Sequence, residues 1–99
     1  MKILTNGHNY ELESFEGTNP QRIQFIEKEP IAGNLETIND GTTNEEVLRV
    51  LIDRMNYLQD KFPCRENKYV IFALEEALVW LEQRTADRKS RGVEGKHLY

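Results

Sequence analysis

The chain has 99 residues and a net charge of −4, and its 38% hydrophobic and 30% charged residues are typical of a globular domain, not of wholesale disorder. So short a chain buries only about two thirds of its unfolded surface, so self-association would add stability to a thin core. No apolar run approaches the roughly 20 residues of a membrane span, and the first residues lack an apolar signal-peptide core. The single cysteine leaves no intrachain disulfide and no zinc cluster, so a reducing cytoplasm is the expected compartment.

Short strands and turns are expected over residues 1–39. In KILTNGHNYEL, Asn6 and Gly7 can adopt the positive φ of a tight hairpin turn. The GTNP segment then interrupts the chain before the next strand.

QRIQFIEKE is predicted as one strand, with Ile23 and Phe25 on the same face. Pro30 and Gly33 are expected to end it, and NLETIND to form another short edge strand. Because so small a sheet is not stable alone, we expect it to pack on helices.

The segment TTNEE predicts the start of a helix, because Thr43 and Glu46 have the spacing of a capping box. Apolar residues follow at steps of three and four, and Pro63 is expected to end the helix. This first stripe consists of Val47, Leu48, Leu51, Met55, Leu58 and Phe62.

A second helix is predicted from Glu66 to Ser90, with Gly92 as its stop signal. Its main apolar stripe consists of Ile71, Leu74, Leu78 and Leu81, and it is widened by Tyr69, Phe72, Ala73 and Trp80. One partner helix cannot cover that width, so the small sheet, a second subunit or both must cover the rest.

These elements predict an α+β fold in a single domain, residues 1–99: a small N-terminal antiparallel β-sheet followed by a long antiparallel two-helix hairpin. Residues 1–39 are the β-rich segment, 42–92 the helical hairpin and 93–99 a C-terminal tail.

Cations gather at the end of the second helix. From Arg84 onwards five basic and two acidic residues give +3, which leaves −7 for the first 83 residues. Three arginines also continue a seam at helical spacing that runs Asn67, Val70, Leu74, Ala77, Leu81, Arg84, Arg88 and Arg91. An exposed helix end explains one or two of these arginines. Three in phase with an apolar seam favour a small anionic ligand, because guanidinium groups grip phosphate in a bidentate fork.

Two further residues are candidates for ligand contact. Tyr57 lies off the core stripe of the first helix, where it could stack on a nucleobase or pack on a neighbour. Asn67 offers a donor and an acceptor, and helix capping is an equally good explanation for it. Seventeen residues of helix, about 26 Å, separate Asn67 from Arg84. One small ligand could therefore touch both only if two hairpins pack antiparallel, which would give two pockets per dimer.

Features of an enzyme are sparse. The sequence has no glycine-rich phosphate loop, no HExxH and no nucleophile elbow. His8 and His97 lie far apart in the sequence, and Glu75 and Glu76 diverge on a helix. Cys64 has no histidine near it in sequence, so a buried structural thiol is a better interpretation than a nucleophile.

The hairpin segments TTNEEVLRVLIDRMNYLQDKFPCREN and LEEALVWLEQRTADRKSRGVEG resemble two families of phage immune-evasion sponges over about residues 42–96. One is the Thoeris anti-defence family that sequesters glyco-cyclic ADP-ribose; the other is the anti-CBASS family that sequesters cyclic oligonucleotides. FPCREN, RTADR and RGVEG recur in order in both. The strand-rich residues 1–39 resemble the Thoeris type, because the anti-CBASS relatives are little more than the hairpin.

The resemblance implies roles for particular residues. Tyr57 matches an aromatic that stacks on the ligand, Asn67 a polar contact, and Arg84 and Arg88 the arginines that hold the pyrophosphate, in a pocket built by two protomers. In RGVEG, Arg91 and Gly92 resemble a second site, used by some relatives for cyclic trinucleotides. Anti-CBASS hairpins often carry a lysine where this chain has Phe72-Ala73, which argues against cyclic dinucleotides in the Tyr57 pocket.

FPCREN has an interpretation in this scheme. Pro63 stops the first helix, Cys64 fills the bend, and Arg65 and Glu66 pair across it. Asn67 is thereby held at the mouth of the pocket.

The expected function is a non-enzymatic sponge in the cytoplasm of an infected bacterial host, a homo-oligomer (dimer or hexamer) without cofactor or metal, acting on neither polymeric nucleic acid nor membrane. One alternative is a helical-hairpin interaction module that binds a host protein. Such a module would not need its arginine seam to bind a small anion. A small hydrolase using Cys64 is a third possibility.

Overall fold

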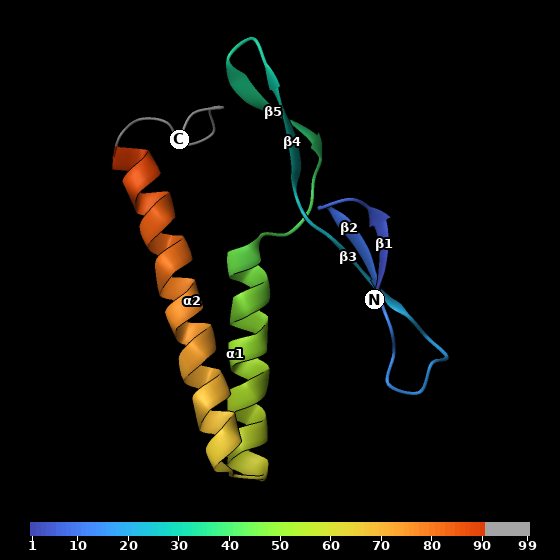
Figure 1. The fold of residues 1–99 in the computed structure, drawn as a ribbon, viewed down its shortest axis with the longest axis vertical. Coiled ribbons are helices and arrows are strands. Elements are labelled where there is room, and N and C mark those ends of the chain that lie inside the picture. The colour runs from blue at the N-terminus through green and yellow to red at the C-terminus, as the bar shows by residue number, and fades with distance from the viewer. Residues whose placement is uncertain (91–99) are drawn as a thin grey trace. The chain divides into compact units, whose positions relative to one another are not determined.

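The computed structural model describes residues 1–90, which divide into two compact units, Met1–Thr43 and the helical part from Asn44 onwards. The first contains the strands β1 (Lys2–Thr5), β2 (Asn9–Leu12), β3 (Gln21–Gln24), β4 (Glu27–Ile31) and β5 (Asn34–Asn39). The second contains α1 (Asn44–Lys61) and α2 (Arg65–Ser90) (Figure 1). The predicted α+β class is confirmed.

The strands β1, β2 and β3 form an antiparallel sheet in that order. Gly7 has a φ of 78° in the turn between β1 and β2, which glycine adopts without steric cost, so the hairpin predicted at Asn6-Gly7 is confirmed. On this sheet the ring of Tyr10 meets that of Phe25 edge to face, with 6.0 Å between the centroids.

The prediction of one strand over QRIQFIEKE is wrong, because β3 ends at Gln24 and β4 begins at Glu27. The backbone between them bonds to distant segments: the Phe25 N–H donates to the His8 carbonyl (2.7 Å) and the Ile26 N–H to the Thr42 carbonyl (2.9 Å). These bonds redirect the chain into a second, two-stranded sheet.

That second sheet consists of β4 and β5 in antiparallel register, with Pro30 opposite Leu35. Pro30 therefore lies inside β4 and does not end the strand, contrary to prediction. A two-stranded sheet has only edge strands, where the missing N–H of proline is tolerated. Gly33, with a φ of 84°, forms the turn, and the edge strand predicted in NLETIND is confirmed.

Gly41 lies where the chain passes close to another backbone segment. A Cβ on this residue would meet the backbone of Gln24 and lie 2.6 Å from the carbonyl carbon of Phe25. The adjacent Thr42 N–H donates to the Gln24 carbonyl at 2.8 Å, which holds the two segments together.

Gly41→Ala is therefore expected to destabilise this junction by about 1–3 kcal/mol, the usual cost of forced overpacking. Amide hydrogen exchange checks it, because the Thr42 and Ile26 amides, which donate across the junction, should exchange faster. Glu36→Ala, at an exposed position of β5, is the control. Unchanged protection of both amides in Gly41→Ala would show that the contact is not tight.

The helices begin and end close to the predicted positions. Thr43 immediately precedes α1, as an N-cap residue should, and α1 ends two residues before Pro63. The start of α2 at Arg65 is one residue from the prediction, whereas the stop predicted at Gly92 lies outside the described residues.

The two helices pack side by side as an antiparallel hairpin (Figure 1). All four residues of the main stripe of α2 are half-buried, as predicted: Ile71, Leu74, Leu78 and Leu81. On α1, four residues of the predicted stripe are half-buried: Val47, Leu48, Met55 and Leu58. Ile52, which was not predicted, is also half-buried, whereas the predicted Leu51 and Phe62 are exposed. Phe62 is the first residue after the end of α1.

Within residues 1–90 no side chain is fully buried. Each unit therefore covers its apolar groups only in part, which accords with the thin core expected for a short chain. None of the described helices is long and apolar enough to cross a membrane.

Candidate functional site

The four predicted ligand contacts lie at opposite ends of the helical hairpin. Tyr57 is four residues before the end of α1, and Asn67 is the third residue of α2, so both lie near the turn. Arg84 and Arg88 lie in the last two turns of α2. Because α2 is one unbroken helix, its rise of 1.5 Å per residue separates Asn67 from Arg84 by about 26 Å. Within one chain, the residues do not meet at one small ligand.

Tyr57 is 57% exposed, and the Lys61 ammonium lies over its ring, with Nζ 5.5 Å from the ring centroid. This is the geometry of a cation–π contact. Sequence reasoning missed Lys61, although its spacing of four residues from Tyr57 on a helix predicts that the two side chains are neighbours.

The turn that carries FPCREN is fixed by several hydrogen bonds. The Phe62 N–H donates to the Leu58 carbonyl (2.7 Å), and the Cys64 N–H donates to Gln59 Oε1 (3.0 Å). Arg65 pairs with Glu66 as predicted, at 3.3 Å, but both side chains are exposed. The prediction of a buried Cys64 is wrong: the thiol is exposed, in the turn between the end of α1 and the start of α2.

Asn67 closes this turn. Its Nδ2 donates to the carbonyl oxygen of Phe62 at 3.3 Å, so the side chain satisfies a carbonyl at the end of the preceding helix. This bond differs from the N-terminal capping expected for Asn67, in which the side-chain oxygen accepts from a backbone N–H, because here the amide nitrogen donates.

Asn67→Ala is accordingly expected to lower the free energy of unfolding by about 1 kcal/mol, the usual net value of one hydrogen bond. Urea denaturation followed by helical circular dichroism, at matched protein concentrations, measures this. Gln83→Ala, which truncates an exposed amide elsewhere on α2, is the control. Equal stability of the two variants would argue that the bond to Phe62 contributes nothing.

The seam that leads to the arginines divides in the structure. Asn67, Leu74, Leu81 and Arg88 are half-buried, whereas Val70, Ala77 and Arg84 are exposed. Arg91 and Gly92, the predicted second site, lie outside the described residues.

A stripe of exposed residues therefore runs along α2 beside its packed face. Its members Val70, Ala73, Ala77 and Trp80 follow at steps of three, four and three, and Arg84 comes four residues later. We call Val70, Ala73, Ala77 and Trp80 the outer stripe of α2. Trp80 is 66% exposed, which is unfavourable for so large an apolar ring in water. The predicted widening of the apolar surface of α2 is confirmed.

Little in the described residues suggests bond-breaking chemistry. Among residues 1–90 no group of three or more His, Cys, Asp or Glu side chains could hold a metal ion. The groove between the helices is a hollow of about 370 Å³ whose polar lining is largely acidic, with Asp53, Glu75 and Glu82 against Arg49. Arg49 is held there by Glu82 at 3.2 Å and Glu46 at 3.6 Å. An anionic ligand would be repelled from this groove.

Comparison with known proteins places the chain. It is 45% identical to a protein named Thoeris anti-defense 1 from Bacillus phage SBSphiJ7 over an alignment of 78 residues. The alignment covers 67% of this chain and 55% of the relative, so the chain spans about half the length of the relative that it matches. The family model described as the Acb2/Tad1 hairpin domain matches residues 20–86, more than half of the chain. The match includes β3 to β5, α1, the turn and most of α2, and on this evidence the chain belongs to the Acb2/Tad1 hairpin-domain family.

Proposed function

We propose that this chain is a phage-encoded anti-defence protein that binds glyco-cyclic ADP-ribose and sequesters it without cleaving it. The observation that carries this proposal is the family match over residues 20–86, which spans Tyr57, Asn67 and Arg84 and stops two residues before Arg88. The name of the Bacillus phage relative, an anti-defence protein against Thoeris, supports the same class of signal.

In the proposed pocket, one protomer supplies Tyr57 and Asn67, and a second supplies Arg84 and Arg88. The Tyr57 ring stacks on the base, and the two guanidinium groups neutralise the pyrophosphate. The separation of about 26 Å along α2 supports this division, because antiparallel hairpins bring the turn of one chain beside the arginines of the other. Two-fold symmetry then gives two equal pockets per dimer.

The outer stripe of α2 supports such an assembly. It is apolar and exposed, and Arg84 follows directly after it on the same helix. Packing two outer stripes antiparallel would cover Trp80 and carry each arginine pair towards the partner's turn. The proposed assembly is an even-numbered homo-oligomer, either a dimer or a hexamer of dimers.

Sequestration requires tight binding and no covalent step, so the proposed protein is not an enzyme and needs neither cofactor nor metal. It acts in the cytoplasm of the infected bacterial host, where the signal is produced. Polymeric nucleic acid and membranes are not its targets: the net charge is −4, and an excess of cations is found only from Arg84 onwards.

The proposal is tested by incubating the protein with glyco-cyclic ADP-ribose, removing unbound ligand and denaturing the complex with heat. Chromatography should then recover the intact ligand in near-stoichiometric amount. Recovery of ADP-ribose would identify an enzyme instead. A second experiment is calorimetry against a panel of cyclic nucleotides, combined with a pull-down from host lysate. If no cyclic nucleotide bound but a host protein were retained, the interaction module would be favoured.

A further inference from the structure

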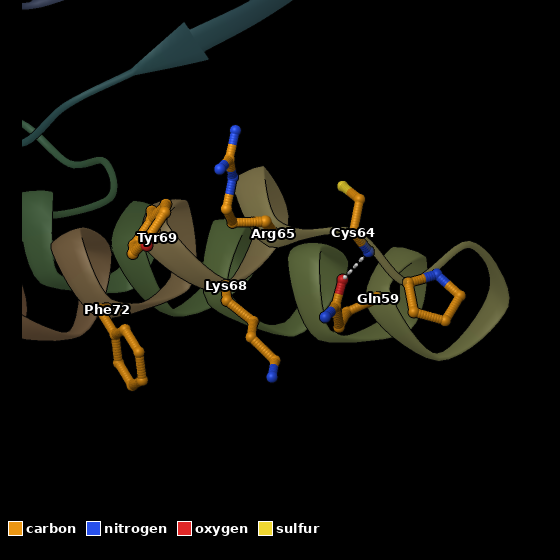
Figure 2. Close-up of a pocket in the computed structure, with 7 residues that line it drawn as sticks. Gln59, Cys64, Arg65, Lys68, Tyr69 and Phe72 are labelled. Carbon is orange, nitrogen blue, oxygen red and sulfur yellow. Dashed lines mark hydrogen bonds between the residues drawn. The ribbon is translucent and has the colours of Figure 1, made fainter.

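A hollow of about 460 Å³ lies at the turn between α1 and α2, on the helical unit (Figure 2). Its volume is within the range of sites for small molecules. The residues that line it are Gln59, Pro63, Cys64, Arg65, Lys68, Tyr69 and Phe72. None of the four residues of the proposed glyco-cyclic ADP-ribose pocket is among them.

Two cations line this hollow in a chain that is acidic overall. Arg65 and Lys68 lie in the first turn of α2. Arg65 forms an ion pair with Glu66, but an exposed pair of this kind contributes little to stability. Another anion can therefore replace Glu66 at little cost. Lys68 makes no ion pair in the part of the chain that the structure describes. The hollow can therefore attract an anion of its own.

Two aromatic rings stand beside these cations. Tyr69 is 64% exposed and Phe72 65% exposed, so much of each ring has no protein contact. Lys68 and Phe72 are four residues apart on the helix, and Figure 2 shows them extending to the same side of α2. The Lys68 ammonium and the Phe72 ring are therefore neighbours on one side of the helix, where one ligand could contact both.

We propose that this hollow binds a nucleoside monophosphate or a compound of the same chemistry: a phosphate group on a planar ring system. The phosphate contacts Lys68, and the base stacks on Phe72, because aromatic side chains stack on bases and cations pair with phosphates. Arg65 extends to the other side of α2 (Figure 2), so it adds positive charge beside the hollow without being a contact of this phosphate. The lining residues of the hollow all come from one chain, and none is Tyr57, Asn67, Arg84 or Arg88, so the hollow and the proposed shared pocket can be tested by different substitutions.

The test uses adenosine 5′-monophosphate as the probe, with adenosine and ribose 5-phosphate as fragments, in NMR titrations of the full chain. Saturable binding of the whole probe is expected, with each fragment at least fivefold weaker. Lys68→Met should weaken binding about fivefold, the upper range for an exposed ion pair. Phe72→Ala should weaken it about 5- to 150-fold, the range for loss of one stacked ring. Lys89→Met and Phe15→Ala are matched controls, since each removes an exposed side chain of the same type elsewhere.

Several results would overturn the proposal: no saturable binding, a fragment that binds as well as the whole probe, or loss of binding in Tyr57→Ala but not in Lys68→Met. The last would assign the probe to the shared pocket. A measurement on the unmodified chain guards against misfolded variants. Cys64 is the single cysteine and lines the hollow, so the bound probe should slow its labelling by a maleimide at least threefold. Labelling at an unchanged rate would place the probe elsewhere.

Discussion

Tyr57→Ala is expected to bind glyco-cyclic ADP-ribose roughly 5- to 150-fold more weakly, because loss of one base-stacking ring costs about 1–3 kcal/mol. Calorimetric titration measures this directly. More than half of the Tyr57 side chain is exposed, so the substitution removes little packing within the chain and should leave the fold intact.

Tyr57→Phe is the matched control, because it retains the ring face and removes only the hydroxyl group. It should bind within about threefold of the unmodified chain. If Tyr57→Ala also bound normally, the ring would not stack on the ligand. If Tyr57→Phe were as weak as Tyr57→Ala, the hydroxyl group would carry the contact.

Trp80→Glu is expected to dissociate the proposed homo-oligomer into monomers at micromolar concentration. A tryptophan buries about 200 Å², and at about 25 cal/mol per Å² covering its exposed two thirds contributes about 3 kcal/mol for each copy. A carboxylate in the same interface would also have to be desolvated without a partner. Light scattering over a dilution series checks the mass.

The same variant should lose most of its affinity for glyco-cyclic ADP-ribose, since each proposed pocket needs two chains. Val79→Glu is the control, because Val79 is also exposed on α2 but is not part of the outer stripe. An oligomeric Trp80→Glu would remove the outer stripe from the interface. A monomer that still bound the ligand tightly would contradict a shared pocket.

Local signals made the helical hairpin predictable. Thr43 and Glu46 mark the start of α1, Pro63 follows its end, and the main stripe of α2 has strict three- and four-residue spacing. The turn at Asn6-Gly7 is also encoded in two adjacent residues. Each of these features depends on side chains that are neighbours in the sequence.

Features that depend on distant backbone were not predictable. QRIQFIEKE reads as one strand, yet bonds from Phe25 to His8 and from Ile26 to Thr42 end β3 and start β4. The hydrophobic pattern of the sequence does not indicate which backbone groups will bond to Phe25 and Ile26. The exposure of Leu51 likewise depends on how α1 and α2 pack, which the width of an apolar stripe does not specify.

The candidate site was predictable in its parts but not in its assembly. Helical spacing gives the separation between Asn67 and Arg84, and the unbroken α2 supports that distance. Arg88 is half-buried and Arg84 is exposed. This difference depends on how the helices pack, so helical spacing alone does not predict it. The contact of Lys61 with Tyr57 and the exposed thiol of Cys64 also emerged only from the structure.

The shared pocket is tested most directly by a mixed dimer of Tyr57→Ala and Arg88→Ala chains, purified through two different tags. If Tyr57 and Arg88 serve one pocket from different chains, both lesions fall in one pocket and the other pocket is unmodified. Titration with glyco-cyclic ADP-ribose should then show one site of near-normal affinity per dimer, although each variant alone binds poorly. If both residues instead served a pocket within one chain, every pocket would carry one lesion, and a titration without any normal site would contradict the shared pocket.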